Sequence, residues 1–229
     1  MQSEWDWEAK TRALWNEQPR QETIAQIERE LSASLKPVRP LPSNRVLVLV
    51  WLGIFVAVSV LGAIPVGFNG FQALSPTRKL LLYAVVGASA VLIARCVVEQ
   101  MIPGLKRVIS PGLAVALPIL SLGILTPLMF PNFDMSGFGQ GMVCLRLGLL
   151  CAAPFGVLAW LLMRRGFLTS PMMAAILGGG FAGLAGIGVL ALHCAIFNAS
   201  HILVWHLGVI AITTAAGAIT GLMLLRVSR

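Results

Sequence analysis

Six apolar runs, each long enough to cross a bilayer, constrain this chain more than any other feature of its sequence. They lie at about residues 46–66, 80–102, 108–130, 141–163, 172–197 and 202–225. A helix needs about 20 apolar residues to cross the hydrocarbon core. The runs do not alternate apolar and polar residues, which excludes the strands of a membrane β-barrel. The sequence therefore predicts an all-α polytopic membrane protein, a bundle of six transmembrane helices over residues 46–229.

The charge balance agrees with this class of protein. Charged residues make up 11% of the chain, against about 25% in soluble domains. Residues 1–45 hold seven Lys/Arg and seven Asp/Glu, so the formal net charge of +8 belongs to the membrane part. There the charge reports topology, and we expect no direct binding of nucleic acid.

The positive charges favour one orientation in the bilayer. Nine lie on the side of the N-terminal segment and two on the other side. The nine are Lys36, Arg39, Arg45, Lys106, Arg107, Arg164, Arg165, Arg226 and Arg229. By the positive-inside rule we expect both termini in the cytoplasm, in agreement with an even number of spans.

Residues 1–45 are predicted to form a short cytoplasmic headpiece with two helices. The first, over residues 3–17, carries Trp5, Trp7 and Trp15. The second, over residues 21–35, has one apolar stripe at helical spacing. The stripe consists of Ile24, Ile27, Leu31 and Leu35.

This stripe needs a cover, because an isolated helix of this length is marginal in water. The candidates are the membrane body, the bilayer surface and a partner protein. The acidic residues of the headpiece count against anionic lipid, since lipid-binding faces are usually basic. A proline-rich connector, residues 36–43, then leads to the first span with Pro37, Pro40 and Pro42.

The polar residues that suggest chemistry gather around the fifth and sixth runs. Residues 186–206 contain Cys194 and all three histidines, His193, His201 and His206. Cys144, near the start of the fourth run, should lie about 5 Å inside the same outer face as Cys194. The two cysteines can meet if their helices are neighbours.

Three roles are open for this outer pair: packing, a disulfide, or the capture of a soft metal ion. A metal site at His193 and Cys194 would need Cys144, His201 or His206 as well. His193 and Cys194 would be about 100° apart on a continuous helix, which prevents them from chelating one ion as a pair. We expect Cys96 and Cys151 to be structural. No catalytic set is evident, so we expect no enzyme and no resident cofactor, at most a transient soft-metal ion.

Two motifs carry a resemblance to a known family. The segment LKPVRPLPS precedes the first span, and the pattern LHC…WH crosses the fifth and sixth. With the six spans, these motifs resemble the NrsF-type bacterial anti-sigma factors over about residues 28–229. The matching positions are Pro37, Arg39, Pro40, Pro42, Cys144, His193, Cys194, Trp205 and His206.

The resemblance implies a bacterial inner-membrane protein that holds an extracytoplasmic-function (ECF) sigma factor inactive. The cytoplasmic N-terminal segment would bind the sigma factor, and the outer cysteines would sense metal or redox stress. The alternative is a small membrane transporter or metal-handling protein that uses the outer Cys/His cluster. Bound metal without a cytoplasmic partner would favour this alternative.

Overall fold

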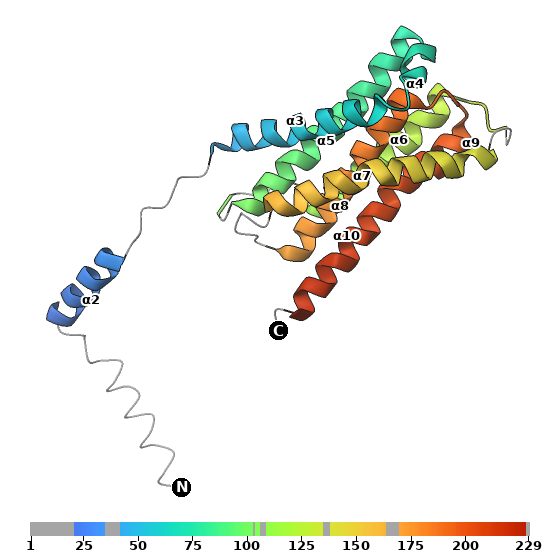
Figure 1. The fold of residues 1–229 in the computed structure, drawn as a ribbon. Helices are drawn as coiled ribbons and strands as arrows, with labels where there is room; N and C mark the ends of the chain where they lie inside the picture. Colours follow the sequence, from blue (N-terminus) through green and yellow to red (C-terminus); the bar gives the residue numbers. More distant parts are fainter. Residues whose placement is uncertain are drawn as a thin grey trace, which may run out of the picture. The chain divides into compact units, whose positions relative to one another are not determined.

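The computed structural model describes residues 21–34, 42–102, 104–105, 109–134, 138–163 and 170–227 (Figure 1). These residues form helices and connecting segments, with no strand among them. Six of the described helices are long and apolar enough to cross a membrane. The prediction of an all-α protein with six membrane-spanning helices is confirmed.

The chain divides into two units, Met1–Leu41 and Pro42–Arg229. In the first unit, helix α2 spans Gln21–Ser34. The side chains of Ile24, Ile27 and Leu31 are all exposed, by 49%, 51% and 57%. The expected helix over residues 3–17, with Trp5, Trp7 and Trp15, lies outside the described residues, as do Leu35, Pro37, Arg39 and Pro40.

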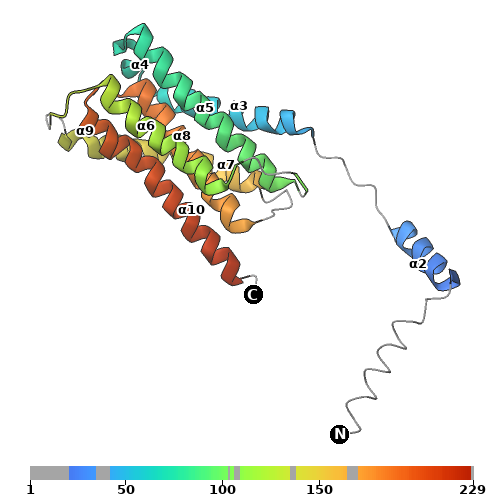
Figure 2. The ribbon, with the colours of Figure 1, turned by 180° about the vertical axis from the view of Figure 1, so that it is seen from behind.

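The second unit contains the six long helices. They are α3 (Asn44–Ala63), α5 (Pro76–Met101), α6 (Pro111–Met129), α7 (Gly141–Met163), α8 (Pro171–His193) and α10 (Leu207–Val227). Shorter elements are α4 (Asn69–Ala73), the 3-10 turn η1 (Phe138–Gln140), α9 (Ala199–His201) and the π-helical turn η2 (Ile202–His206). We call the end of the bundle where the chain enters at Asn44 the near end, and the end that carries α4 and α9 the far end (Figures 1 and 2).

Three of the long helices begin at a Ser-Pro pair. Pro76, Pro111 and Pro171 occupy the first turns of α5, α6 and α8. Proline is tolerated there because the first N–H groups of a helix have no partner within it. The Ser110 and Ser170 hydroxyls accept hydrogen bonds from backbone N–H groups in the first turns of α6 and α8. Local chemistry thus fixes where these helices start, α5 at the far end and α6 and α8 at the near end.

Helix α8 is the centre of the bundle. Of its most apolar stretch 78% is buried, whereas the values for the other five spans range from 17% to 44%. Glycines allow the neighbouring helices to approach it closely, as expected of GxxxG patterns in membranes. The Cα atoms of Gly179 on α8 and Gly217 on α10 face each other across one such contact.

Aromatic side chains join α3 to α7 and α8 near the middle of the bundle. The Trp51 ring of α3 lies 6.3 Å from Phe155 of α7 and 5.9 Å from Phe181 of α8, centroid to centroid. Phe55 stacks on the same Phe181 ring. Because α3 follows the connector directly, the helix nearest to the headpiece in sequence packs on the two helices that lead to the cysteines.

The expected fifth and sixth spans differ from the helices at their shared boundary. The fifth was expected to run to residue 197, but α8 ends at His193 and the next five residues are not helical. The sixth was expected from residue 202, but helical structure begins at Ala199. Hydropathy does not detect this change, since the residues from Cys194 to Phe197 are mostly apolar.

The contact between α8 and α10 gives a stability prediction. A Cβ atom on Gly217 would lie 2.3 Å from the carbonyl oxygen of Ala175. Gly217→Ala should therefore lower the free energy of unfolding by about 1–3 kcal/mol, as overpacking does. Steric-trap unfolding in detergent micelles measures this quantity. Gly53→Ala is the control because a Cβ there meets nothing within 4 Å, and equal stability of the two variants would contradict the packing argument.

Candidate thiol–imidazole site

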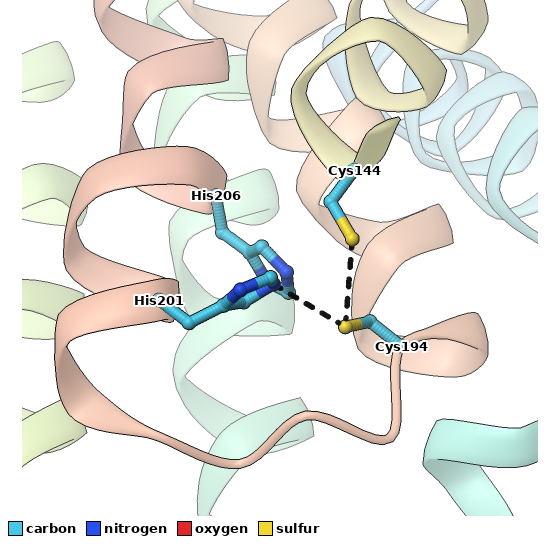
Figure 3. A group of neighbouring side chains, drawn as sticks. All are labelled: Cys144, Cys194, His201 and His206. Atoms are coloured by element: carbon cyan, nitrogen blue, oxygen red, sulfur yellow. Dashed lines mark hydrogen bonds between the residues drawn. The ribbon is translucent and has the colours of Figure 1, made fainter. Parts of the chain in front are cut away.

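Two cysteines and two histidines meet at the far end of the bundle (Figure 3). Cys144, Cys194, His201 and His206 are exposed by 8%, 5%, 1% and 6%. Each offers one ligand atom, and these four atoms all lie within 4.8 Å of one another. We call these residues the thiol–imidazole site.

The two cysteines come from neighbouring helices. Cys144 lies in the first turn of α7, and Cys194 directly follows the last residue of α8. Cys194 has extended backbone angles, φ −77° and ψ 119°, while its N–H still bonds to the Leu190 carbonyl at 2.8 Å. The turn out of the helix leaves the Cys194 sulfur 3.7 Å from the Cys144 sulfur.

The π-helical turn η2 brings the two histidines together. On an α-helix, residues five apart differ by about 500°, which leaves their side chains about 140° apart. In a π turn the hydrogen bonds run between residues five apart, so that these residues lie over one another. Here the Leu207 N–H bonds to the Ile202 carbonyl. The His201 and His206 rings consequently meet edge to face, with centroids 5.3 Å apart.

Hydrogen bonds tie the segment between α8 and α9 to the end of α6. The Ala199 N–H donates to the Asn132 carbonyl at 2.8 Å. The Asn198 amide and the Ser200 hydroxyl both donate to the Asp134 carbonyl, and Asn198 Oδ1 accepts from the Ser200 backbone. These bonds set the position of α9, and with it the position of His201.

Trp205 packs over the start of α7. A Cβ atom on Gly141 would lie 1.8 Å from the indole ring, so only glycine leaves room for this side chain. The Phe138 ring covers Trp205 from the side, with centroids 5.0 Å apart. Trp205 therefore fixes η2 against α7, the helix that carries Cys144.

His193 lies outside the group of four, although the sequence placed it among the candidate residues. Its ring nitrogen Nδ1 is 3.3 Å from the Gly67 carbonyl, in the turn between α3 and α4. The helix does end beside Cys194, but the group of four ligand atoms within 4.8 Å of one another does not include His193. Cys96 and Cys151 are free thiols that do not belong to the group either.

The geometry fits a tetrahedral metal ion. With bonds of about 2.3 Å to sulfur and 2.0–2.1 Å to nitrogen, a tetrahedral site has S–S edges of about 3.8 Å and S–N edges of about 3.6 Å. The observed S–S distance is 3.7 Å, and the distance from Cys194 Sγ to His201 Nε2 is 3.6 Å. Two thiols and two imidazoles form a donor set typical of Zn²⁺ and other soft divalent ions.

The polar atoms of the site also fit a bound metal ion. His206 Nε2 is buried and has no hydrogen-bond partner among the described residues. Such atoms are costly unless a ligand or water satisfies them. The hydrogen bond with Cys144, together with burial, raises the pKa of the Cys194 thiol above its ordinary value. This thiol therefore keeps its proton at neutral pH, and a metal ion that bound here would displace the proton.

The residues that build the site without belonging to it were not predicted from the sequence. Asn132 and Asp134 orient α9 through their backbone carbonyls, Asn198 does so through its side-chain amide, and Gly141 makes room for Trp205. The spacing of five between His201 and His206 is the only sequence signal of the π turn. By itself this spacing argues against a shared helix face.

These features together define a multi-pass helical membrane protein with a buried thiol–imidazole site at one end. The model of one family, NrsF, described as negative regulator of sigma F, matches residues 31–227. The chain belongs to this family, whose members are anti-sigma regulators and not enzymes, and a sigma factor is the partner that the family implies. Comparison with curated proteins and with solved structures finds no match.

The hydrogen bonds of Asn198 give a prediction for the site. Asn198→Ala removes the donor to Asp134 and the acceptor for Ser200, so the free energy of unfolding should fall by about 1–2 kcal/mol. Thermal unfolding in detergent measures the loss. Gln72→Ala, on the exposed surface of α4, is the control and should have little effect. A variant as stable as the control would mean that these bonds do not hold the segment.

Proposed function

We propose that this anti-sigma factor binds an ECF sigma factor through its N-terminal segment, on the cytoplasmic side of the bacterial inner membrane. Binding of a soft metal ion at the thiol–imidazole site releases the sigma factor. The observation that carries the proposal is the exposed apolar stripe of α2, in a chain whose family regulates a sigma factor.

The stripe is suited to a groove in a partner protein. Ile24, Ile27 and Leu31 follow the spacing of three and four that amphipathic helices use when they bind in grooves. A 14-residue helix gains stability when its apolar side is covered. Further partner contacts are proposed for the flanking residues Trp5, Trp15, Leu35, Pro37, Arg39, Pro40 and Pro42.

The orientation rests on the distribution of charge. Arg226, at the end of α10, lies at the near end of the bundle with the start of α3 and Arg45. The far end carries Arg78 and Lys79, in the first turn of α5. The bias of the whole sequence, nine positive charges against two, supports a cytoplasmic near end and cytoplasmic termini. The thiol–imidazole site then faces the opposite compartment.

Capture of the sigma factor tests the role of α2. Ile24→Asp with Leu31→Asp should weaken binding to the full-length protein at least about 100-fold, since apolar anchors of this kind contribute about 2 kcal/mol each. Binding of purified sigma factors to the immobilised protein in detergent measures the affinity.

The matched control for this experiment is Gln26→Asp with Ala33→Asp. It adds two carboxylates at the same spacing on the opposite side of α2, where binding should survive. Equal loss in both variants would indicate a general effect of charge or folding. Retention of binding in the stripe variant would refute the proposed role of α2.

Metal binding would couple the far end of the bundle to the headpiece through α3. An ion at the site joins the start of α7, the end of α8 and the turn before α10. The Trp51 and Phe55 rings of α3 pack on α7 and α8. A signal shifts such an equilibrium only by its different affinity for the two states. Near-complete release needs about 5.5 kcal/mol, and structural Zn²⁺ sites supply about 10–16 kcal/mol.

Metal is a better signal for this geometry than a disulfide. A disulfide would join only Cys144 and Cys194 and would leave the two histidines without a role. A metal ion would use all four side chains, whose ligand atoms lie within 4.8 Å of one another. This difference supports a metal ion as the ligand.

Cadmium ions test this step, because thiolate and imidazole bind them strongly. Micromolar Cd²⁺ should dissociate the sigma factor from the full-length protein, and Cys144→Ser or His206→Gln should prevent this. Cys151→Ser is the control, since its thiol lies outside the site. Release that persists in the site variants would refute the sensor. Cd²⁺ binding by a chain that binds no sigma factor would favour a metal-handling protein.

A further inference from the structure

The thiol–imidazole site has an opening at the far end of the bundle. A recess of about 350 Å³ reaches Cys144 and Cys194 from the surface. Three polar side chains are among the residues that line it, Asn69, Gln140 and His193. Asn69 and Gln140 are exposed and His193 is half-buried, so polar side chains share this recess with two buried thiols. We call this recess the vestibule.

The two histidines of the site do not line the vestibule. Another cavity touches Cys194 and His206 from within the bundle, but its volume is about 30 Å³ and its walls are mainly Leu, Ile, Met and Phe side chains. A hydrated divalent ion is larger than this cavity and would lose its water against apolar groups. The vestibule is therefore the more favourable route for a hydrated divalent ion, because polar side chains are among the residues that line it.

His193 is oriented as a metal ligand would be. A carbonyl oxygen only accepts hydrogen bonds, so the contact with Gly67 requires a proton on His193 Nδ1. In the neutral ring the lone pair is then on Nε2. Metal-binding histidines are commonly oriented in this way, by a backbone carbonyl at the nitrogen that does not bind the ion. His193 is also the residue before Cys194.

We propose that His193 is a capture ligand, which binds an incoming divalent ion in the vestibule and passes it to the buried site. This inference rests on the proposed metal site and adds the route by which the ion arrives. Water leaves the ion as His193 Nε2 binds, and the Cys194 and Cys144 sulfurs then replace further ligands. Each thiol releases its proton to water in the vestibule. His201 and His206 complete the four bonds as His193 lets go, and no oxidation state changes.

A capture ligand speeds loading without adding to final affinity, and this difference defines the experiment. His193→Asn keeps a side-chain N–H for the Gly67 carbonyl and removes Nε2. In the full-length protein in detergent, Cd²⁺ loading followed by the thiolate–cadmium charge-transfer absorption should slow at least about tenfold, a change within the usual range for association rates. The equilibrium dissociation constant for Cd²⁺ should stay unchanged.

A second variant tests the vestibule itself. Val143 lines the recess and is 66% exposed, so Val143→Trp should narrow the opening and also slow loading. Leu150→Trp is the control, since it adds the same ring at an exposed position of α7 that does not line the recess. Loading of this control should match the unmodified protein.

The outcomes separate the capture role from the proposed sensor. Equal loading rates for the unmodified protein and His193→Asn would overturn the capture role while leaving the site intact. A weaker equilibrium affinity in His193→Asn would also overturn it, because His193 would then belong to the final ligand set. A protein that binds no Cd²⁺ would overturn both the site and the capture role, while sigma-factor binding through α2 is measured without metal.

Discussion

The close approach of the other helices to α8 is the constraint on which the bundle depends. In a bilayer, apolar side chains gain little from leaving lipid, so helix association relies on packing and close backbone contact. Glycines supply this contact here: a Cβ on Gly179, Gly186 or Gly217 would meet a backbone oxygen within 2.6 Å. Close packing of the bundle therefore depends on glycines of α8 and α10, which have no side chain to keep the helices apart.

The site inherits its geometry from this central helix. Because α7 and α8 are close neighbours, the first turn of α7 reaches the end of α8, where the Cys194 backbone becomes extended. Gly70 of α4 packs directly on the backbone of that end, and the Tyr83 hydroxyl donates to the Ala191 carbonyl. The position of one thiol is thus fixed by three neighbouring elements, which favours a preformed site.

The sequence was sufficient for the six spans and for the expectation that Cys144 and Cys194 could meet. Both inferences use quantities that can be calculated from neighbouring residues alone. Hydropathy is summed over a stretch of sequence, and depth in the bilayer follows from a residue's position within its span. The end of α8 at His193 was not predictable in this way, because it depends on hydrogen bonds from Asn198 and Ser200 to a segment more than sixty residues away. The pairing of His201 with His206 was missed for a related reason. It requires a π-helical turn, which a regular α-helix does not contain.

The π turn also bears on how such a site could change during evolution. A π turn contains one residue more than the α-helical turn it replaces. Loss of a single codon within Ile202–His206 would restore regular α-helix and leave the two histidines four residues apart, about 40° from each other on one helix face. The six spans would keep their hydropathy and the N-terminal helix its sequence. One small deletion would thus shorten the turn without parting the two imidazoles, because a regular helix presents histidines four residues apart on the same face.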